Sequence, residues 1–312
     1  MEKDMYEREL ERFMNGTQDT VKLCRNTPDG DMTVSACYIL PGIFLALNDI
    51  HMQTVPCNRE GLPLDLLIMN YCLQGRCEFK LDDDSYNYID YNMMNITAGM
   101  AQDYFYYPAS AYLGYEIYIF PDMFQKETEN ILELFHISIR ELQRRYKKGV
   151  ACYASDELLR LWNDISSQEE FENVGQLRLD VLQILKHMQE HPMIQPVNTL
   201  YLSKAQTMLA KQAQELLVED LSRHLSMKAV SERLRVSETS LKRYFRFVYG
   251  MNVSAYMNER RMVYAAELLT ESKQSIADIA RACGYVNQGR FAQVFRDYYG
   301  ERPLDYRRMY SG

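Results

Sequence analysis

The amino-acid sequence predicts an α+β protein with a β-rich N-terminal domain, a helical middle segment and an all-α C-terminal domain that contains two helix-turn-helix units. Three observations lead to this expectation. Short apolar runs separated by turn residues fill the first part of the chain. Apolar residues then recur every three or four positions, and the end of the chain repeats a pattern of two short helices around a tight turn. With 312 residues, 47% of them apolar, the chain is long enough for two or three folded units.

The β-rich domain is expected in residues 1–124. Tyrosine, isoleucine, leucine and phenylalanine dominate residues 34–120, and pairs such as Pro41-Gly42 and Gln74-Gly75 interrupt them as turns. The spacing of these runs is typical of an antiparallel barrel or a double-sheet roll. The clearest strands are expected at residues 66–73, 76–81, 86–91 and 111–120.

A helical coupling and dimerisation segment is expected in residues 125–192, followed by a linker in residues 193–203. Apolar residues follow the helical period there, and Pro192 and Pro196 end the last helix because proline has no amide donor. The apolar faces allow two interpretations. They pair with a second subunit, which would add affinity for paired binding sites, or they only cover the β domain. The residues concerned are Leu132, Phe135, Ile139 and Leu142.

The first helix-turn-helix unit is expected at residues 226–246, within a C-terminal domain of residues 204–312. Ser226 and Ser237 are each suited to cap a short helix, because a serine oxygen accepts a hydrogen bond from an unpaired amide of the first turn. Apolar residues fall on the inner faces of the two helices, at Val230, Leu234, Val236, Leu241 and Phe245. The outer face of the second helix carries Thr239, Lys242, Arg243 and Arg246.

The second unit is expected at residues 275–296, after a long spacer helix from about residue 253 to 270. Ser275 and Asp278 form a start that resembles a capping box. Gly284 supplies the backbone freedom that the turn needs. Phe291 and Phe295 are placed to anchor the second helix to the core.

Charge is distributed unevenly along the chain. The net charge of −8 combines −14 for residues 1–199 with +6 for residues 200–312, where 18 lysines and arginines face 12 acidic residues. A basic segment can neutralise phosphates and release counterions, whereas a strongly acidic one is repelled by nucleic acid. Any contact with DNA is therefore expected in the C-terminal third.

The last 105 residues or so resemble the AraC/XylS family of transcription regulators. The resemblance rests on the order of helix-turn-helix, long helix and second helix-turn-helix, and on the motifs that follow one another in the second unit. These motifs are Ile276-Ala277-Asp278-Ile279-Ala280, Gly284-Tyr285, Phe291, Phe295-Arg296 and the ending Tyr299-Gly300-Glu301-Arg302-Pro303-Leu304-Asp305-Tyr306-Arg307.

The resemblance implies that the second helix of each unit reads one of two successive major-groove segments of double-stranded DNA. Arginine can grip guanine and glutamine can pair with adenine, whereas lysine and threonine discriminate less. The competing interpretation is that some of these residues only solvate a helix face. The implied base-reading residues are Thr239, Lys242, Arg243, Gln288, Arg290 and Gln293, and the implied phosphate contacts are Ser237, Arg246 and Arg296.

Three residues depart from the family pattern. Ser231 stands where alanine is usual, and Arg235 stands where the first turn usually has glycine. A residue other than glycine in a left-handed turn costs about 1 kcal/mol. Gly289 replaces a commoner serine, and glycine inside a helix weakens it by about 0.5 to 1 kcal/mol. Because of Arg235, the first helix-turn-helix unit is expected to be slightly strained.

By the same resemblance, the N-terminal domain is expected to be a cupin-like barrel that binds a small organic effector. The candidate ligand residues are Arg59, Tyr104, Tyr106 and Tyr115, although alternating aromatic residues in a strand also make an ordinary barrel core. The sequence leaves this choice open, as it leaves open whether the regulator is an activator that meets RNA polymerase.

No cofactor, metal site or catalytic site is expected. His51 is the single histidine in the barrel region, and no nucleophile elbow, phosphate-binding glycine loop or zinc motif is present. The cysteines contain no Cys-x-x-Cys pair, so reduced and buried thiols are expected, with Cys72 and Cys77 as an alternative redox pair. No apolar run is long enough to span a bilayer, and we expect a cytoplasmic homodimer without membrane contact.

Three functions fit these observations: a ligand-responsive regulator, a regulator controlled by a partner protein or by its own abundance, and an enzyme fused to a DNA-binding module, such as an alkyl-transfer repair protein. The third would need a cluster of zinc-binding cysteines near the amino terminus, and the cysteine spacing does not provide one.

Overall fold

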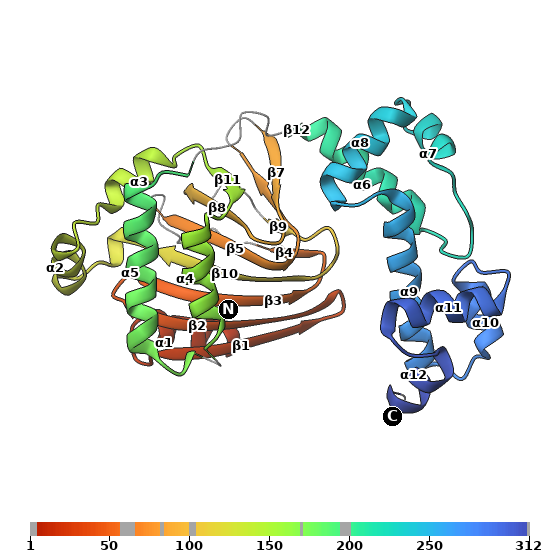
Figure 1. Cartoon of the computed structure of the whole chain (residues 1–312), viewed down its shortest axis with the longest axis horizontal. Helices are drawn as coiled ribbons and strands as arrows, with labels where there is room; N and C mark the ends of the chain where they lie inside the picture. Colours follow the sequence, from red (N-terminus) through yellow and green to blue (C-terminus); the bar gives the residue numbers. More distant parts are fainter. Residues whose placement is uncertain are drawn as a thin grey trace. The chain divides into compact units, whose positions relative to one another are not determined.

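The computed structural model describes residues 5–56, 66–81, 84–99, 104–168, 171–193 and 201–310. The chain divides into two compact units, Met1–Ser203 and Lys204–Gly312. The strands lie in the first unit, and the second is built from helices (Figure 1). Most of the predicted linker, residues 194–200, lies outside the described residues.

The first unit contains two antiparallel sheets. The larger has seven strands in the order β1-β2-β3-β10-β5-β8-β11, and the smaller has five in the order β12-β7-β6-β9-β4. Both sheets are open, so the region is not the closed barrel that the sequence suggested. The strands are β1 (Thr20–Thr27), β2 (Gly30–Leu40), β3 (Ile43–His51), β4 (Thr54–Pro56), β5 (Leu67–Gly75), β6 (Cys77–Lys80), β7 (Ser85–Ile89), β8 (Met93–Ala98), β9 (Tyr104–Tyr106), β10 (Tyr112–Ile119), β11 (Val150–Tyr153) and β12 (Leu202–Ser203).

The four clearest predicted strands correspond to β5, β6, β7 and β10. The sheet begins earlier than the predicted apolar region, because β1 pairs with β2 over its whole length although few of its residues are buried. β11 lies inside the segment predicted to be helical. It is a four-residue strand that pairs with β8, and such a pairing leaves no periodic signal in the local sequence.

The two faces of the larger sheet pack against different partners. On one face, Tyr71 and Tyr115 stack on Trp162, with ring centroids 5.0 and 6.0 Å apart, and helices α4 and α5 cover the sheet (Figure 1). On the other face, residues such as Cys72 and Tyr112 pack against the smaller sheet. The first unit therefore has a layer of helices, a large sheet and a smaller sheet.

Over its described residues, the predicted helical segment forms four helices. The helical period expected in this segment is interrupted after Leu134, because α2 ends there and His136 has a φ of 52°. Leu132, Ile139 and Leu142 are buried against the large sheet, so these residues cover the sheet and are not the exposed dimer face considered above. The helices of the first unit are α1 (Met5–Met14), the 3-10 turn η1 (Pro121–Met123), α2 (Lys126–Leu134), α3 (Ile139–Arg145), α4 (Asp156–Ser166) and α5 (Val174–Glu190).

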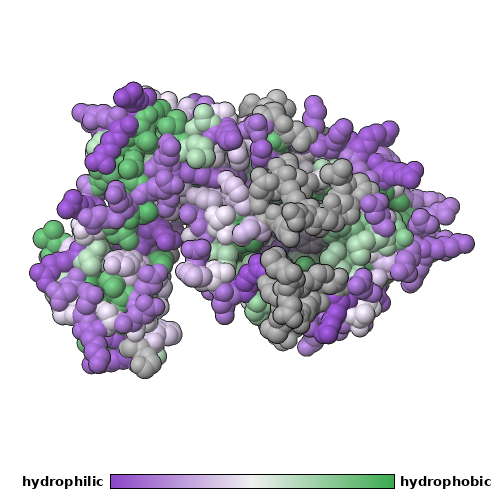
Figure 2. Space-filling model, turned by 180° about the vertical axis from the view of Figure 1, so that it is seen from behind, coloured by the Kyte–Doolittle hydropathy of each residue, from purple (hydrophilic) through white to green (hydrophobic). Residues whose placement is uncertain are grey.

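The second unit contains two groups of helices connected by the long helix α9 (Figure 1). Hydrophilic residues cover much of the face seen in Figure 2, with smaller apolar patches between them, as is usual for a protein surface. The helices are α6 (Lys204–Val218), α7 (Met227–Arg233), α8 (Glu238–Tyr249), α9 (Val253–Glu271), α10 (Ile276–Ala282), α11 (Gln288–Tyr299) and α12 (Pro303–Tyr310).

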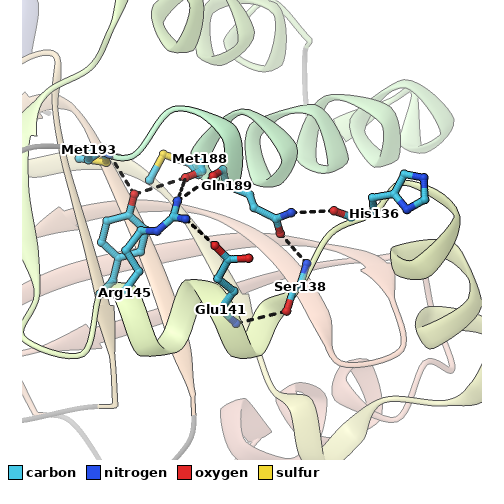
Figure 3. A network of polar contacts seen from close by, with 8 residues as sticks. His136, Ser138, Glu141, Arg145, Met188, Gln189 and Met193 are labelled. Atoms are coloured by element: carbon cyan, nitrogen blue, oxygen red, sulfur yellow. Dashed lines mark hydrogen bonds and ion pairs between the residues drawn. The ribbon is translucent and has the colours of Figure 1, made fainter.

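Within the first unit, hydrogen bonds tie α3 to the end of α5 (Figure 3). The Arg145 guanidinium donates to the carbonyl oxygens of Met188 at 3.2 Å and Gln189 at 2.7 Å, and to the Glu141 carboxylate at 2.6 Å. These bonds satisfy carbonyls that the end of α5 leaves without partners, so Arg145 anchors α3.

Candidate nucleic-acid interface

Helices α7 and α8 form the first helix-turn-helix unit, and both begin at the predicted caps. The hydroxyl oxygen of Ser226 accepts a hydrogen bond from the amide of Ala229 at 3.2 Å. The hydroxyl of Ser237 accepts one from the amide of Ser240, also at 3.2 Å. These bonds satisfy amides that have no partner within the helix, so the cap positions determine where each helix starts.

The inner side of α8 is fixed by apolar and aromatic contacts. Leu241 and Phe245 are fully buried. The ring of Phe245 lies 4.4 Å from that of Tyr249 and 5.3 Å from that of Tyr256 on α9, measured between centroids. From α6, the side-chain amide of Gln206 donates a hydrogen bond to the Tyr244 hydroxyl at 3.2 Å. One face of α8 is therefore fixed by packing, and the opposite face is exposed to solvent.

The turn of this unit shows the departures predicted from the sequence. Arg235 has a left-handed backbone, with a φ of 55°, at the position where glycine would be unstrained. Ser231 is buried where the two helices cross, and its hydroxyl donates to the carbonyl oxygen of Lys228 at 2.8 Å. The serine is thus small enough and its polar group is paired, so the backbone strain is confined to Arg235.

Helices α10 and α11 form the second helix-turn-helix unit, and both begin at capping residues, as α7 and α8 do. The Ser275 hydroxyl accepts from the Asp278 amide at 3.1 Å, and hydrogen bonds from Ser275 and Arg281 hold the pKa of the Asp278 carboxyl below its usual value. Asn287 caps α11 by accepting from the amide of Arg290 at 2.9 Å. Phe291 and Phe295, as predicted, are fully buried.

The outward faces of α8 and α11 are polar and open to solvent. Several of these side chains are engaged only locally. The Lys242 ammonium pairs with Glu238 at 2.6 Å, and the Gln293 amide donates to Asp297 at 2.7 Å. Such exposed contacts contribute little to stability and can be exchanged for a ligand. The exposed residues are Ser237, Thr239, Lys242, Arg243, Arg246, Gln288, Arg290, Gln293 and Arg296.

Three arginines on these faces are free of ion pairs. No hydrogen bond or salt bridge joins the guanidinium groups of Arg246, Arg290 and Arg296 to another residue in the part of the chain that the structure describes. Solvated and unpaired guanidinium groups on an exposed helix are available for phosphate oxygens or for the acceptor edge of guanine. Both α8 and α11 therefore carry at least one such group.

A residue that the sequence analysis did not single out links the two helix-turn-helix units. Arg261 lies on α9, and its guanidinium donates to the carbonyl oxygens of Leu221 at 3.2 Å and of Arg223 at 3.1 Å. Leu221 and Arg223 belong to the segment between α6 and α7, and Gly284, in the turn of the second unit, lies against the same carbonyl and the same arginine. The contact is non-local, so no local sequence signal could have indicated it.

Among the candidate ligand residues that the structure describes, Tyr104 and Tyr106 share strand β9, and Tyr115 lies apart from them. Tyr115 faces the helices and stacks on Trp162, whereas Tyr106 is buried in the smaller sheet and Tyr104, at the start of β9, is 41% exposed. Arg59 lies outside the described residues. Tyr115 is thus core, which is the alternative that the alternating aromatic pattern had left open.

Instead, a row of polar side chains crosses the inner face of the larger sheet. Glu116 on β10 pairs in register with Asn70 on β5, which pairs with Asn95 on β8. Asn48 on β3 pairs in register with Gly114 on β10. Gly114 lies two residues before Glu116 and therefore on the same face of the sheet. All four polar residues are buried. Sequence reasoning missed this row because its members lie on four strands and meet only through sheet register.

Glu116 is the charged member of this row. Burial raises the pKa of its carboxyl, and the Tyr118 hydroxyl, which donates a hydrogen bond to that carboxyl, opposes the rise. Two further polar atoms in this interior, the Tyr112 hydroxyl and the Asn87 side-chain nitrogen, are buried without a hydrogen-bond partner among the described residues. Unpartnered buried groups of this kind are costly and call for a water or a ligand.

The buried thiols argue against a redox pair. Cys72 and Cys77 are free and lie in one cluster, but burial raises the pKa of Cys72 to about 12 and that of Cys77 well above its usual value. Thiolates are the reactive form, so both sulfurs are suited to packing. Among the described residues, no group of three or more possible ligands could hold a metal ion, and no helix is long and apolar enough to cross a membrane.

Comparisons with known proteins agree with this geometry. A family model described as a helix-turn-helix domain matches residues 230–309. The transcriptional activator RhaR of Yersinia pestis is 34% identical over 94 residues, which are 30% of this chain and 32% of RhaR. The chain thus spans about a third of the length of this relative.

A shorter relative is matched over most of its length. The regulatory protein SoxS of Salmonella typhimurium is 34% identical over 93 residues, which are 30% of this chain and 87% of SoxS. Among solved structures, the C-terminal domain of the response regulator AraT from Geobacillus stearothermophilus is 30% identical, with a TM-score of 0.32 over 33% of this chain and 87% of that chain. The chain therefore belongs to the AraC/XylS family of helix-turn-helix, DNA-binding transcription regulators.

Proposed function

We propose that the protein binds promoter DNA sequence-specifically, with α8 and α11 in successive major-groove segments. The observation that carries this proposal is the pairing of two capped helices, each buried on one side and each presenting an unpaired guanidinium on the other. A short helix of this kind fits the major groove, with its amino-terminal turns toward the base edges.

The exposed side chains divide into two roles in this proposal. Residues near the start of each helix read base edges, because they lie where a docked helix comes closest to the bases. Ser237, at the cap before α8, and residues further along each helix hold phosphates and position the helix without reading sequence. The base-reading residues are Thr239, Lys242, Arg243, Gln288, Arg290 and Gln293, and the phosphate contacts are Ser237, Arg246 and Arg296.

Selection of bound fragments from random duplex DNA by the full-length protein tests this proposal. The selected fragments should share two short conserved segments about one helical turn apart. Binding to the selected site should weaken steeply as salt rises, because phosphate contacts release counterions. Selection that yields no shared segment, or binding that does not change with salt, would mean that the exposed residues only solvate the helices.

The relatives bear on the direction of regulation. RhaR is named as a transcriptional activator. By analogy, this protein acts as an activator that meets RNA polymerase at the promoter, in the cytoplasm, as a homodimer and without catalytic activity of its own. A promoter fusion that carries the selected site should gain expression when the protein is present, and loss of expression would identify a repressor instead.

The first unit acts as a sensor of a small polar molecule in this proposal. The buried carboxylate of Glu116 would accept from donor groups of the molecule, and the unpartnered Tyr112 hydroxyl and Asn87 amide would donate to its acceptor atoms. A compound rich in hydroxyl groups offers both kinds of atom. The alternative is a regulator without such a ligand, controlled by a partner protein or by its own abundance.

Thermal unfolding of the first unit separates these alternatives. A bound effector raises the unfolding temperature in proportion to its concentration and affinity. Polyols, sugars and amino acids should be screened with the wild type and with the variant Tyr112→Phe, which removes one unpartnered hydroxyl. A compound that stabilises the wild type more than the variant supports the sensor, and the absence of any stabilising compound favours the alternative.

A further inference from the structure

The turn of the second helix-turn-helix unit is one residue longer than that of the first. Four residues, 234–237, separate α7 from α8, and five residues, 283–287, separate α10 from α11. The longer turn therefore contains one residue that has no counterpart in the first unit, although both turns connect helices of similar length.

Backbone hydrogen bonds show which residue of the longer turn is extra. The amide of Val236 donates to the carbonyl oxygen of Ser231 at 3.1 Å, and the amide of Tyr285 donates to the carbonyl oxygen of Ala280 at 2.8 Å. Val236 and Tyr285 therefore occupy the same place in their turns. In the first turn the capping residue of α8 follows directly, whereas in the second turn Val286 stands before the capping residue of α11. Val286 is thus the additional residue.

The side chain of Val286 gains no burial from its own fold. It is 102% exposed, whereas Val236 of the first turn is half-buried. The residue before a helix cap often packs against the fourth residue of the helix. Here that fourth residue, Phe291, is fully buried, and its ring centroid lies 5.6 Å from that of Tyr285. Tyr285 takes the place on Phe291, and the valine is left in solvent.

Val286 is nevertheless held in a defined position. Tyr285, before it, is fixed by its backbone hydrogen bond and by its contact with Phe291. Asn287, after it, caps α11 by accepting a hydrogen bond from the Arg290 amide at 2.9 Å. A β-branched side chain also has few rotamers, so its methyl groups point in a fixed direction. Little conformational entropy is therefore lost when this side chain is covered.

The start of α11 is more exposed than the start of α8. All residues from 286 to 290 are exposed, whereas exposed and half-buried residues alternate from 236 to 240. A recognition helix enters the major groove with its amino-terminal residues nearest the base edges. Val286, two residues before α11 begins, lies at this leading end of the helix.

The major groove offers one apolar group, the 5-methyl group of thymine. The three base-reading residues proposed for α11 are polar, and their hydrogen-bonding groups do not recognise a methyl group. A single exposed valine is ordinary on a protein surface, but here it lies at the end of the helix that meets the bases. Covering it with a methyl group would remove apolar area of both partners from water.

We propose that Val286 contacts the 5-methyl group of a thymine in the major-groove segment that α11 occupies, and so selects thymine at one base pair. This inference rests on the proposed function, because it adds one base-contacting residue to the same interface. Removal of the thymine methyl should weaken binding about fourfold, as expected for the burial of one methyl group. Removal of the valine methyls should abolish this dependence.

Uracil substitution in the selected DNA site tests the contact, because uracil differs from thymine only in lacking the 5-methyl group. Each thymine of the two conserved segments is replaced in turn, and the full-length wild type and Val286→Ala are titrated against each duplex at one salt concentration. The wild type should bind one of the uracil duplexes about fourfold more weakly than the parent duplex. Val286→Ala should bind that duplex and the parent duplex equally well.

Two further variants serve as controls. Val286→Thr keeps one methyl group on the β-carbon and should still bind the uracil duplex more weakly than the parent duplex. Leu304→Ala removes an exposed apolar side chain from α12, outside both helix-turn-helix units, and should discriminate as the wild type does. Equal binding of the two duplexes by either control variant would contradict the assignment to the valine methyls.

The contact is overturned if the selected segments contain no thymine, or if no uracil substitution weakens binding of the wild type. It is also overturned if Val286→Ala loses as much affinity on the uracil duplex as the wild type does. These results would leave the selected site, and with it the proposed function, intact. A wild type that selects no site would instead contradict the proposed function itself, and the Val286 contact with it.

Discussion

Gly284 lies against the carbonyl oxygen of Leu221, and a β-carbon built on Gly284 would be 2.7 Å from that oxygen. Gly284 belongs to the turn of the second helix-turn-helix unit, and Leu221 precedes the first unit. The same carbonyl accepts a hydrogen bond from Arg261 on α9. The turn of the second helix-turn-helix unit therefore packs closely against the segment between α6 and α7, which precedes the first helix-turn-helix unit.

The variant Gly284→Ala should destabilise the DNA-binding unit by more than the cost of its backbone conformation alone. Gly284 has a φ of 77°, which costs an alanine about 1 kcal/mol, and the contact with Leu221 adds steric repulsion. Gly300→Ala is the control, because Gly300 has a similar φ of 80° and no atom within 4 Å of its added β-carbon. Urea unfolding should show a clearly larger loss for Gly284→Ala, and equal losses would contradict the close contact.

The variant Arg235→Gly should stabilise the first helix-turn-helix unit by about 1 kcal/mol, because glycine adopts a positive φ without strain. The Arg235 side chain is exposed, so its removal should sacrifice few packing contacts. Native-state hydrogen exchange of the α7 and α8 amides measures this change locally. Slower exchange there, with unchanged exchange in α10 and α11, is the expected result, and unchanged exchange in α7 and α8 would show that the turn stores no strain.

Arg290→Ala should relax sequence preference at one base position, with a loss of about 1 to 3 kcal/mol on the selected site. The reason is that a bidentate contact to guanine discriminates against the other bases. Competition binding against single-base variants of the site measures this preference. Arg246→Ala is the comparison. Loss of a phosphate contact should weaken binding to all sites alike and should reduce the slope of the logarithm of the binding constant against the logarithm of the salt concentration by about one. If Arg290→Ala also weakened binding to all sites alike, Arg290 would contact a phosphate and not a base.

The pH dependence of the stability of the β-rich unit, Met1–Ser203, should report on the protonation of Glu116. Because burial raises the pKa of this carboxyl above its ordinary value of 4.5, the folded protein binds more protons than the unfolded chain between 4.5 and the raised pKa. Its contribution to stability is therefore fully present below pH 4.5 and is lost as pH rises through the folded pKa. Glu116→Gln cannot titrate at this position.

Unfolding of the wild type and of Glu116→Gln should be compared across this pH range by Trp162 fluorescence, which follows the first unit because Trp162 lies in its core. The wild type should lose stability relative to the variant as pH rises. A difference between the two proteins that is constant with pH would show that the Glu116 carboxyl titrates normally.

The helix-turn-helix elements were predictable because their signals are local. Ser226, Ser237 and Ser275 lie within three residues of the amides that they cap, and Phe291 and Phe295 lie one helical turn apart. The strain at Arg235 was also predictable, because a left-handed turn residue is recognised by its place in the motif. The site residues were placed on exposed helix faces as expected, but their roles on DNA stay proposals.

By itself, the sequence determined the family, the two helix-turn-helix units and the division between a β-rich and a helical region, because capping, helical period and turn chemistry act over a few residues. Tertiary structure alone decided that Leu132, Ile139 and Leu142 cover the sheet, that Glu116, Asn70 and Asn95 form one buried row, and that Arg261 ties α9 to the segment before α7. These contacts join residues far apart in the chain, and sheet register and helix packing, which no local pattern specifies, bring them together.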